Sequence, residues 1–561
     1  MRIAIACFDA NIRIYHETLQ FFSQMLWPEH EVVQLGCDGL LNRCTNFLSY
    51  GEVIDTKWLT KNKENICKRC KANQGLMPGF SKFHLSKNED ALTEEQSQII
   101  NRLKDVKALK GFELLGIYYG SAPIGRLAFF DFSMINKLTD KSQLSEAQLE
   151  DYLEHLKDCF HVWNFVERVT KSQPPDAVIY VNGNYSLNAV VRECLKRLKT
   201  KCWSIEFTWA NTILEKKIYI EEDRLIHSRT WKSLEKAKKR YGSNLKDSRV
   251  AIHSFKSRIF GEDFNSYSSP LRTPEWSKFD RFKARFKEVI SVFVSSADEL
   301  VIHEVVYGFR QDKSFFKDQF EWLKFIVDNA NPEVGYVIRL HPRLKPNKRD
   351  KVEASEYPKV IKALEAARGL NNFLIIEPDA EISSYYVLIN SQLSIISWSM
   401  MAMESVILGV PTVVCFPKNM SFPAEEWGPH PASLEEIRRF LTRETIPART
   451  DKHDIELMKW AEILYSAIGL KVPGVRYAKT FTERLYRIIQ SRVLSSNLLF
   501  NLFYKWRYRK KIVVMSGGQL ELVPETVTPS ERQNQALKSL EELRKFREEA
   551  IAVFNDQKNK N

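Results

Sequence analysis

Residues 334–415 constrain the fold of this chain most, because they read as three buried strands separated by helical segments. Three short runs rich in Ile and Val are each bounded by polar or turn residues, which is typical of parallel strands covered on both faces. The runs span residues 336–340, 373–376 and 393–396. They predict an open α/β sheet, and the ligands of such sheets bind beyond the carboxyl ends of the strands.

Polar side chains follow each of the three predicted strands. Because parallel strands end at one edge of a sheet, an imidazole, a guanidinium, carboxylates and two hydroxyls are expected to face one crevice. The first strand contains Arg339 and leads to His341 and Arg343, the second leads to Glu377 and Asp379, and the third leads to Ser397 and Ser399.

A helix is expected after the third strand, from Met401 to the natural stop at Gly409. Ser397 and Ser399 then lie at the helix N-terminus, where free backbone N–H groups favour an anion such as phosphate. Glu404, on the first turns of this helix, is placed to accept hydrogen bonds from the hydroxyl groups of a ribose or a sugar. The alternative is that the serines only cap the helix and Glu404 is a surface charge.

The order of these motifs resembles the C-terminal half of a GT-B glycosyltransferase. Strand-His-Pro-Arg, then strand-Ser-x-Ser-helix-Glu-x(4)-Gly-x-Pro, is most similar to the capsule and surface-polysaccharide group that includes the bacterial Kdo transferases, and bacterial sialyltransferases use a similar pattern to hold CMP. The upstream SVFVSSADEL, with Ser295 and Ser296, resembles the serine-rich strand end of the same nucleotide domain. The resemblance covers residues 289–415. It implies an α/β fold with two Rossmann-like domains facing a cleft and a nucleotide-sugar on the second domain.

The N-terminal half begins with a strand, a helix and a second strand, expected at residues 2–8, 10–26 and 31–35, an order that suits a Rossmann-like domain. Asp9 lies in the loop after the first strand, where a catalytic or acceptor-binding group is expected. No G-x-G-x-x-G pattern follows, so a dinucleotide site is not predicted.

A second pattern in this half is strand–Asn-Gly-Asn–helix–strand–Glu, with strands expected at residues 177–181 and 201–207. Asn182, Gly183 and Asn184 are candidate acceptor-binding residues. Glycosyl transfer needs a base for the acceptor hydroxyl, and Glu206 and Asp9 are the candidates. A glutamate at a strand end is otherwise a solvated or capping residue.

Four cysteines fall close together in the sequence, as a C-x(6)-C pair and a C-x-x-C pair. Four thiolates could hold a structural Zn²⁺ tetrahedrally, and a cluster or four reduced thiols are the alternatives. A cytosolic setting argues against disulfides. The residues are Cys37, Cys44, Cys67 and Cys70.

The length of 561 residues predicts two domains and an extension. We expect an N-terminal acceptor domain over residues 1–270, a linker near 270–287, a nucleotide-sugar-binding domain over 288–490 and a basic amphipathic and charged helical tail over 491–561. No run approaches the ~20 apolar residues that span a bilayer. Residues 1–10 read as a strand rather than a signal peptide, so a cytoplasmic protein is expected.

The net charge of +13 calls for a negatively charged partner. No zinc-finger, RNP-like or helix-turn-helix pattern stands out, so nucleic acid is not predicted as that partner. Residues 496–511 mix Leu, Phe and Trp with five Lys or Arg and contain no acidic residue. Such a segment could lie on an anionic inner membrane face, making the protein peripheral there. The alternative is a helix packed on the domain with a solvated basic face.

Together these features predict a glycosyltransferase that moves a sugar, which could be CMP-activated, from a nucleotide-sugar to a capsule polysaccharide, lipopolysaccharide or other glycolipid acceptor. His341 and Arg343 would neutralise charge on the leaving phosphate. No convincing D-x-D motif is present, so neither a catalytic metal nor another cofactor is predicted. The alternatives are a CDP-glycerol-type phosphotransferase, a sugar-nucleotide epimerase and a non-catalytic glycan-assembly scaffold.

Overall fold

The computed structural model of this chain describes most of its residues. The described ranges are 1–50, 54–79, 81–104, 111–139, 144–207, 216–224, 248–260, 275–347, 350–420, 424–428, 431–462, 470–472, 485, 489, 492–494, 496–505, 512–515, 519–522 and 529–559. Several sequence predictions fall largely outside them: the start of the linker at residue 270, the helix expected at 478–493 and the basic run at 506–511.

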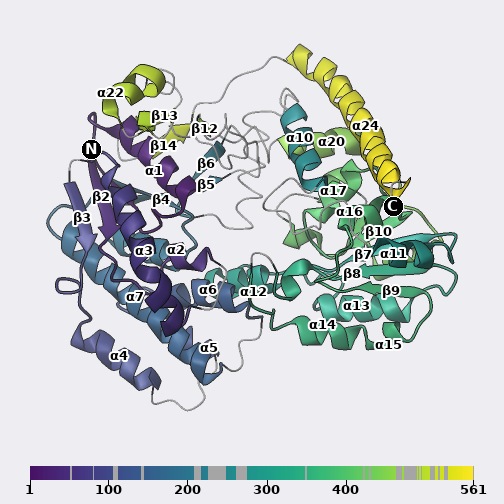
Figure 1. Cartoon of the computed structure of the whole chain (residues 1–561), viewed down its shortest axis with the longest axis horizontal. Coiled ribbons are helices and arrows are strands. Elements are labelled where there is room, and N and C mark those ends of the chain that lie inside the picture. The colour runs from purple at the N-terminus through teal and green to yellow at the C-terminus, as the bar shows by residue number, and fades with distance from the viewer. Residues whose placement is uncertain are drawn as a thin grey trace. The chain divides into compact units, whose positions relative to one another are not determined.

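The chain divides into two compact units (Figure 1). Unit 1 comprises Met1–Ile226, Val305–Gly308 and Gly469–Glu525. Unit 2 comprises His227–Glu304, Phe309–Ile468 and Thr526–Asn561. The chain therefore returns to unit 1 after completing most of unit 2, and ends in unit 2.

The sheet of unit 1 has the strand order β12-β6-β5-β4-β1-β2-β3. Five of its strands pair in parallel, and β6 and β12 are added at one edge through antiparallel pairing, β6 to β5 and β12 to β6. Chain order across the parallel part is therefore 3-2-1-4-5, the arrangement of a Rossmann-like sheet. The strands are β1 (Arg2–Ala6), β2 (Glu31–Cys37), β3 (Ser81–Leu85), β4 (Ala177–Val181), β5 (Lys201–Phe207), β6 (Lys216–Glu222) and β12 (Leu470–Val472).

Helices pack on this sheet through apolar side chains. Phe21 and Phe22 of α1 are fully buried with Ile5 of β1 and Ile179 of β4 in one core cluster. The longest helix of the unit, α7, starts at a capping box between Ser145 and Gln148. The helices are α1 (Arg13–Leu26), α2 (Thr45–Leu48), α3 (Thr56–Gly75), α4 (Glu94–Lys104), α5 (Gly111–Leu114), α6 (Ile124–Asn136), α7 (Glu146–Thr170) and α8 (Ser186–Arg197).

The late segment of unit 1 is not one continuous helix. It consists of α22 (Asn497–Phe500), a π-helical turn over Asn501–Lys505, and a hairpin of β13 (Ile512–Met515) and β14 (Gln519–Leu522). Phe500 is buried, and its ring lies edge-on to that of Phe21 at 5.7 Å. Leu494 lies in the same core cluster and Tyr504 packs against it, so the start of the amphipathic tail expected from the sequence is tied to the core of unit 1.

The sheet of unit 2 has five parallel strands in the order β11-β10-β7-β8-β9. In chain order this reads 5-4-1-2-3, so it repeats the Rossmann-like arrangement of unit 1. Phe293 lies opposite both Arg339 and Ile396, which makes the three central strands end at the same level. The strands are β7 (Val289–Phe293), β8 (Gly335–Arg339), β9 (Phe373–Ile376), β10 (Leu393–Ile396) and β11 (Thr412–Val414).

Helices of unit 2 follow most of its strands, and the C-terminal helix α24 is anchored to the unit by Arg547. That guanidinium donates to the Asp454 carboxylate at 2.9 Å and to the carbonyl oxygen of Ile407 at 2.7 Å. The last three residues of α12 belong to unit 1. The helices are α10 (Ser248–Ile259), α11 (Trp276–Lys283), α12 (Asp298–Tyr307), α13 (Gln319–Asp328), η1 (Pro342–Leu344), α14 (Tyr357–Ala363), α15 (Glu365–Arg368), α16 (Ser384–Ile389), α17 (Met401–Ile407), η2 (Pro417–Asn419), α18 (Ala424–Trp427), α19 (Leu434–Leu441), α20 (Asp451–Glu462) and α24 (Pro529–Asn559).

The predicted α/β class with two Rossmann-like sheets and a helical C-terminal segment is confirmed. Residues 336–340, 373–376 and 393–396 were expected as strands, and β8, β9 and β10 lie there. Among the helices that the structure describes, none is long and apolar enough to cross a membrane.

Candidate functional site

The predicted site residues gather at equivalent places in the two sheets. In a sheet of order 3-2-1-4-5, neighbouring first and fourth strands lead to helices on opposite faces, and the crevice between their carboxyl ends is the usual ligand site. In unit 1 this point lies between β1 and β4, which lead to Asp9 and to the Asn182–Asn184 turn. In unit 2 it lies between β7 and β10, which lead to Ser295 and to Ser397. Each unit therefore presents predicted residues at its own switch point.

In unit 2, a serine network joins the two strand ends. The Ser397 hydroxyl donates to the Ser295 hydroxyl oxygen at 2.7 Å, and the Ser295 hydroxyl donates to the carbonyl oxygen of Trp398. Both serines are almost completely buried. Their hydroxyls therefore hold the two loops together, while Ser296 and Ser399, which are half-buried, are the serines of this edge that a ligand can reach.

Arg343 lies at the same edge with its charge already paired. Its guanidinium contacts the carboxylates of Asp298 and Glu299, in the first turn of α12. The Asp298 side chain is completely buried, whereas that of Glu299 is 56% exposed. The Nδ1 atom of His341 accepts the backbone N–H of Arg343 at 3.1 Å, which starts the short helix η1 and fixes the orientation of the imidazole.

Arg339, another predicted donor-binding residue, is almost completely buried, and its side chain bonds to backbone. Its guanidinium donates to the carbonyl oxygens of Glu377 and, at 3.3 Å, Ala380. Burial lowers its pKa to about 10. Arg339 therefore fixes the loop that follows β9, and in this structure it faces peptide groups.

One buried acid at this edge was missed by the sequence analysis. The Glu356 carboxylate accepts the backbone N–H of Ala297 at 2.7 Å and the side-chain amide of Gln319 at 3.1 Å. Burial raises its pKa to about 8. It lies in a polar stretch without periodicity, so no local pattern distinguishes it from a surface glutamate.

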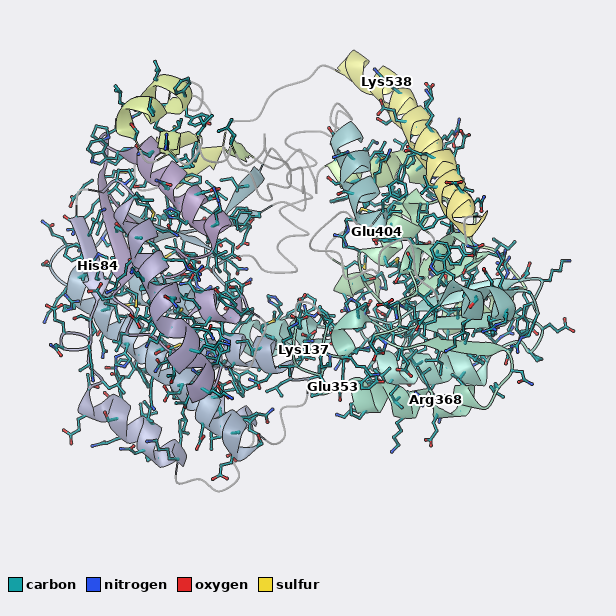
Figure 2. All side chains as sticks on the ribbon, viewed as in Figure 1. His84, Lys137, Glu353, Arg368, Glu404 and Lys538 are labelled. Atoms are coloured by element: carbon teal, nitrogen blue, oxygen red, sulfur yellow. The ribbon has the colours of Figure 1, made fainter. Side chains whose placement is uncertain are left out.

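Glu404 lies on α17 (Figure 2), and its carboxylate contacts two other side chains of unit 2. One carboxylate oxygen is 2.8 Å from Nε of Arg258, and the other accepts the hydroxyl of Tyr385 at 3.0 Å. The side chain is 2% exposed. The predicted role of Glu404 in binding a ribose stays a prediction, and the structure adds a second role as the buried partner of Arg258.

The helix α17 starts at Met401 and has only seven residues. Ser399 precedes it by two residues and accepts the Met401 N–H at 3.2 Å, as a capping hydroxyl does. Ser397 lies further back, at the end of β10, and bonds to the β7 loop instead. The two predicted serines thus have different partners.

In unit 1, the two candidate bases are buried carboxyl groups. Burial raises the pKa of Asp9 to about 7 and that of Glu206 to about 8. Both lie close to Tyr15, whose pKa is raised by burial and then by Tyr185, Asp9 and Glu206. A carboxyl whose pKa is near the working pH is well suited to general base catalysis.

The Asn182–Asn184 turn is connected to Glu206 through a serine. The Gly183 N–H donates to the Ser204 hydroxyl oxygen at 2.9 Å, and that hydroxyl donates to the Glu206 carboxylate at 2.7 Å. Asn182 has a φ of 49°, and its side chain accepts the Asn184 N–H at 3.1 Å. A Cβ at position 183 would lie 2.7 Å from the Tyr180 ring, so glycine is required for this close approach.

The buried carboxyls of unit 1 predict a pH-dependent stability. Burial raises the pKa of Asp131 to about 7, as it raises that of Glu206 to about 8. Because the native protein keeps these protons at pH values where the unfolded chain has released them, the free energy of unfolding should fall as the pH rises from about 5 to about 8. Thermal unfolding across this range measures the effect.

The variants Glu206→Gln and Asp131→Asn should each flatten this pH dependence. Glu95→Gln, on the exposed face of α4, is the matched control and should leave the slope unchanged. A stability that rises over the same pH range would show that these carboxyls are ionised in the native protein.

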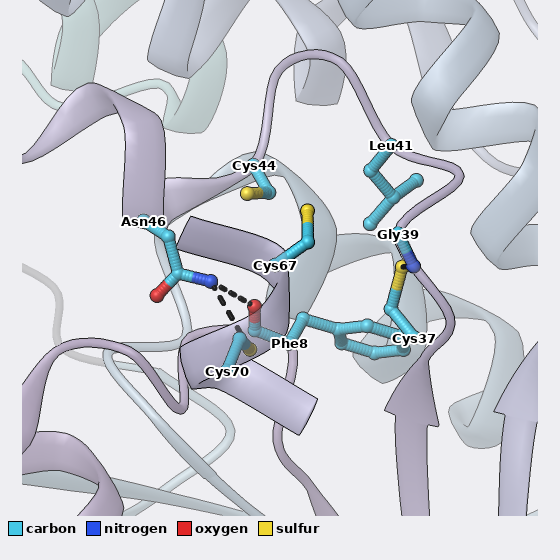
Figure 3. A pocket seen from close by; sticks show the side chains of 8 residues that line it. All are labelled: Phe8, Cys37, Gly39, Leu41, Cys44, Asn46, Cys67 and Cys70. Carbon is cyan, nitrogen blue, oxygen red and sulfur yellow. Dashed lines mark hydrogen bonds between the residues drawn. The ribbon is translucent and has the colours of Figure 1, made fainter. Parts of the chain in front are cut away.

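The four predicted metal-ligating cysteines also come together in unit 1, around a single small cavity (Figure 3). Among the described residues, no group of three or more His, Cys, Asp or Glu side chains is arranged to hold a metal ion. The zinc site predicted from the sequence therefore stays a prediction, which the arrangement of the four cysteines does not by itself support.

No model of a known protein family matches this chain, and no curated protein matches its sequence significantly. Solved structures with similarity to it include Kdo transferases, other glycosyltransferases and UDP-GlcNAc 2-epimerases. The beta Kdo 2,7 transferase KpsC of Thermosulfurimonas dismutans has 11% identity and a TM-score of 0.30, over 58% of this chain and 89% of that one.

Two further structures cover more of this chain. The UDP-GlcNAc 2-epimerase of Neisseria meningitidis bound to UDP-GlcNAc has 9% identity and a TM-score of 0.25, over 83% of this chain and 95% of that one. The calicheamicin glycosyltransferase CalG4 has 11% identity and a TM-score of 0.23, over 83% of this chain and 94% of that one. The matches include the group that residues 289–415 resemble, but with TM-scores this low their activities are not carried over to this chain.

Proposed function

We propose that this protein is a GT-B-type glycosyltransferase that moves a sugar from a nucleotide-sugar to a glycan or glycolipid acceptor. The observation that carries the proposal is the convergence of the predicted residues on the switch points of two sheets with the same strand order. Unit 2 supplies serines at its switch point and, after the neighbouring strand β8, an imidazole and a guanidinium, which suits a phosphate group. Unit 1 supplies two buried carboxyls, which suit a hydroxyl acceptor.

Arg343 would bind the donor by exchanging one of its two carboxylate partners for a phosphate oxygen. Asp298 holds the guanidinium from the buried side, and the exposed Glu299 carboxylate occupies the side open to solvent. A phosphate oxygen is a stronger bidentate partner for arginine than a solvated glutamate is. The leaving phosphate would therefore displace Glu299 from Arg343, with His341 and Ser399 as further contacts.

Acceptor activation would use Glu206, with Asp9 as the second candidate. The base takes the proton of the acceptor hydroxyl as that oxygen attacks the anomeric carbon, and the bond to the nucleotide phosphate breaks. The positive charge of Arg343 and the polar contacts of His341 stabilise the negative charge that then develops on the phosphate. These side chains account for the chemistry without a metal ion or another cofactor.

A nucleotide panel tests the donor class. The protein should be stabilised against thermal unfolding by one of CMP, UDP or GDP, since a ligand that binds only the native state raises its stability. His341→Ala should weaken this nucleotide at least about tenfold, because a hydrogen bond to a charged group is lost. His453→Ala is the matched control, since its Nδ1 also accepts a backbone N–H, from Thr450 at 3.3 Å.

The same panel separates the rival functions. Stabilisation by CDP-glycerol alone would favour a phosphotransferase, conversion of a free nucleotide-sugar to its epimer would favour an epimerase, and no response to any nucleotide would favour a scaffold. An unchanged affinity in His341→Ala would show that the nucleotide binds elsewhere.

We also propose that unit 1 attaches the protein to an anionic membrane surface, the inner leaflet of a cytoplasmic membrane. Three apolar side chains of α22 and the following turn face solvent: Leu498 is 78%, Leu502 72% and Phe503 58% exposed. Lys505 follows them but pairs with Glu29 of the same unit, and the adjoining sequence adds four basic residues without an acidic one. Exposed apolar groups next to basic ones suit a lipid interface.

Vesicle binding tests this attachment. Serine at positions 498, 502 and 503 should reduce binding to anionic vesicles at low salt at least about tenfold, because buried apolar area and charge act together there. Leu198→Ser, which changes another exposed leucine of unit 1, should leave binding intact. Equal binding by both variants would contradict the membrane proposal.

A further inference from the structure

Tyr307 contacts the Asn182–Asn184 turn of unit 1 from a distant part of the chain. It is the last residue of α12 and belongs to unit 1, and its hydroxyl donates to the carbonyl oxygen of Asn184 at 2.7 Å. The two residues are 123 positions apart. No local sequence pattern connects a helix end to a loop at that separation, so Tyr307 could not be found from the sequence.

Side chains hold the middle of this turn from several directions. The Gly183 N–H donates to the Ser204 hydroxyl oxygen at 2.9 Å, and the Gly183 carbonyl oxygen accepts from the guanidinium of Arg192 at 2.5 Å. The next carbonyl along the chain, that of Asn184, accepts from Tyr307. Arg192 and Tyr307 therefore fix two consecutive carbonyl groups of the turn.

The ring of Tyr307 is itself held by three neighbours within unit 1. The Arg224 guanidinium lies 3.7 Å from the ring centroid and that of Arg192 lies 5.7 Å from it. The ring of Phe130 is 5.5 Å away. A guanidinium this close to a tyrosine ring is attracted to its face. Because these contacts do not involve the hydroxyl, removing the hydroxyl should leave the ring in place.

The two side chains that hold the turn differ in how cleanly they can be removed. Arg192 is 1% exposed, and its charge is balanced by Glu193 at 3.0 Å and by Asp223 at 3.3 Å. An Arg192 variant would therefore disrupt a buried ion-pair network. Burial raises the pKa of Tyr307 to about 12, so its hydroxyl keeps the proton that it donates. Loss of that hydroxyl removes a neutral hydrogen bond only.

We propose that Tyr307 is a positioning residue of the acceptor site, which acts by holding the Asn184 carbonyl and with it the turn. The same turn donates through Gly183 to Ser204, whose hydroxyl donates to Glu206. A turn already fixed in one conformation binds an acceptor without paying for its own ordering. The role in acceptor binding rests on the proposed transferase function, whereas the holding of the turn does not.

Hydrogen exchange of the full chain tests the holding of the turn without any substrate. Tyr307→Phe keeps the ring contacts and removes one hydrogen bond. The amides of Gly183 and Asn184 should then exchange about three- to tenfold faster, the factor that one such bond supplies. Tyr152→Phe is the matched control, because the Tyr152 hydroxyl donates to the carbonyl oxygen of Gly125 at 3.2 Å elsewhere in unit 1. It should leave exchange in the turn unchanged.

Transfer kinetics test the role in acceptor binding. With octyl glycosides as synthetic glycolipid acceptors, Tyr307→Phe should raise the KM for the acceptor about three- to tenfold and leave kcat and nucleotide affinity unchanged. Tyr152→Phe should keep all three constants. A wild-type protein that transfers no sugar would contradict the proposed function, and the exchange measurement would still decide whether Tyr307 holds the turn.

Two results would overturn the inference. Equal exchange of the turn amides in Tyr307→Phe and in the wild type would show that other bonds hold the turn. In an active protein, a KM for the acceptor that stays at the wild-type value, or that rises equally in Tyr152→Phe, would show that Tyr307 does not position the acceptor site.

Discussion

Glu206→Gln should lower the rate of sugar transfer about 100- to 10,000-fold, the range in which a general base contributes. The amide keeps the size of the side chain and can still accept the Ser204 hydroxyl, which lies 2.7 Å from the carboxylate, but it cannot take a proton. Nucleotide binding should stay intact, because the proposed donor site lies in the other unit. Turnover of the nucleotide-sugar selected by the panel measures the loss.

The pH profile separates the base from a structural carboxyl. Burial raises the pKa of Glu206 to about 8, so the active, ionised form should increase as the pH rises toward that value. Glu222→Gln, on the exposed side of β6, is the control and should keep the wild-type rate and profile. If Asp9→Asn is inactive while Glu206→Gln is not, the base is Asp9.

Arg258→Leu should destabilise the protein by about 3–5 kcal/mol, the usual cost of removing one partner of a buried ion pair. The variant leaves the Glu404 carboxylate, which is 2% exposed, without the guanidinium that now lies 2.8 Å away. Lys256→Leu on the same helix is the control, because Lys256 pairs with Glu549 where both side chains are well exposed. Its loss should cost less than about 1 kcal/mol.

The double variant Arg258→Leu, Glu404→Gln should recover much of that loss, since the two residues are coupled. Denaturant unfolding of the single and double variants gives the coupling energy. Equal stability of Arg258→Leu and Lys256→Leu would show that Glu404 is not held by Arg258 in solution. Glu404 would then be available for the ribose, as the sequence analysis predicted.

Most of the sheet architecture could be predicted from the sequence, because the parallel strands are short apolar runs. β8, β9 and β10 fall where Ile and Val cluster, and each is almost wholly buried. β3 was not predicted: its sequence SKFHL lies at an edge and has mostly half-exposed residues, so no apolar run indicates it. Strand order was implied only through the family resemblance.

The partners of the site residues could not be predicted, because they come from distant parts of the chain. Arg258 reaches Glu404 from a helix 146 positions earlier, within a region that reads only as charged and helical. Asp298 and Glu299 hold Arg343 from the start of α12, more than forty positions earlier in the chain. A sequence shows which charges exist, and only the fold shows which of them neutralise each other.

The position of bound nucleotide tests the central claim most directly. A crystal structure with the nucleotide selected by the panel should show its phosphates at the carboxyl ends of β7 and β10, beside His341, Ser296 and Ser399, with Arg343 released from Glu299. Phosphates bound at any other surface, with these three side chains still facing solvent, would contradict the account.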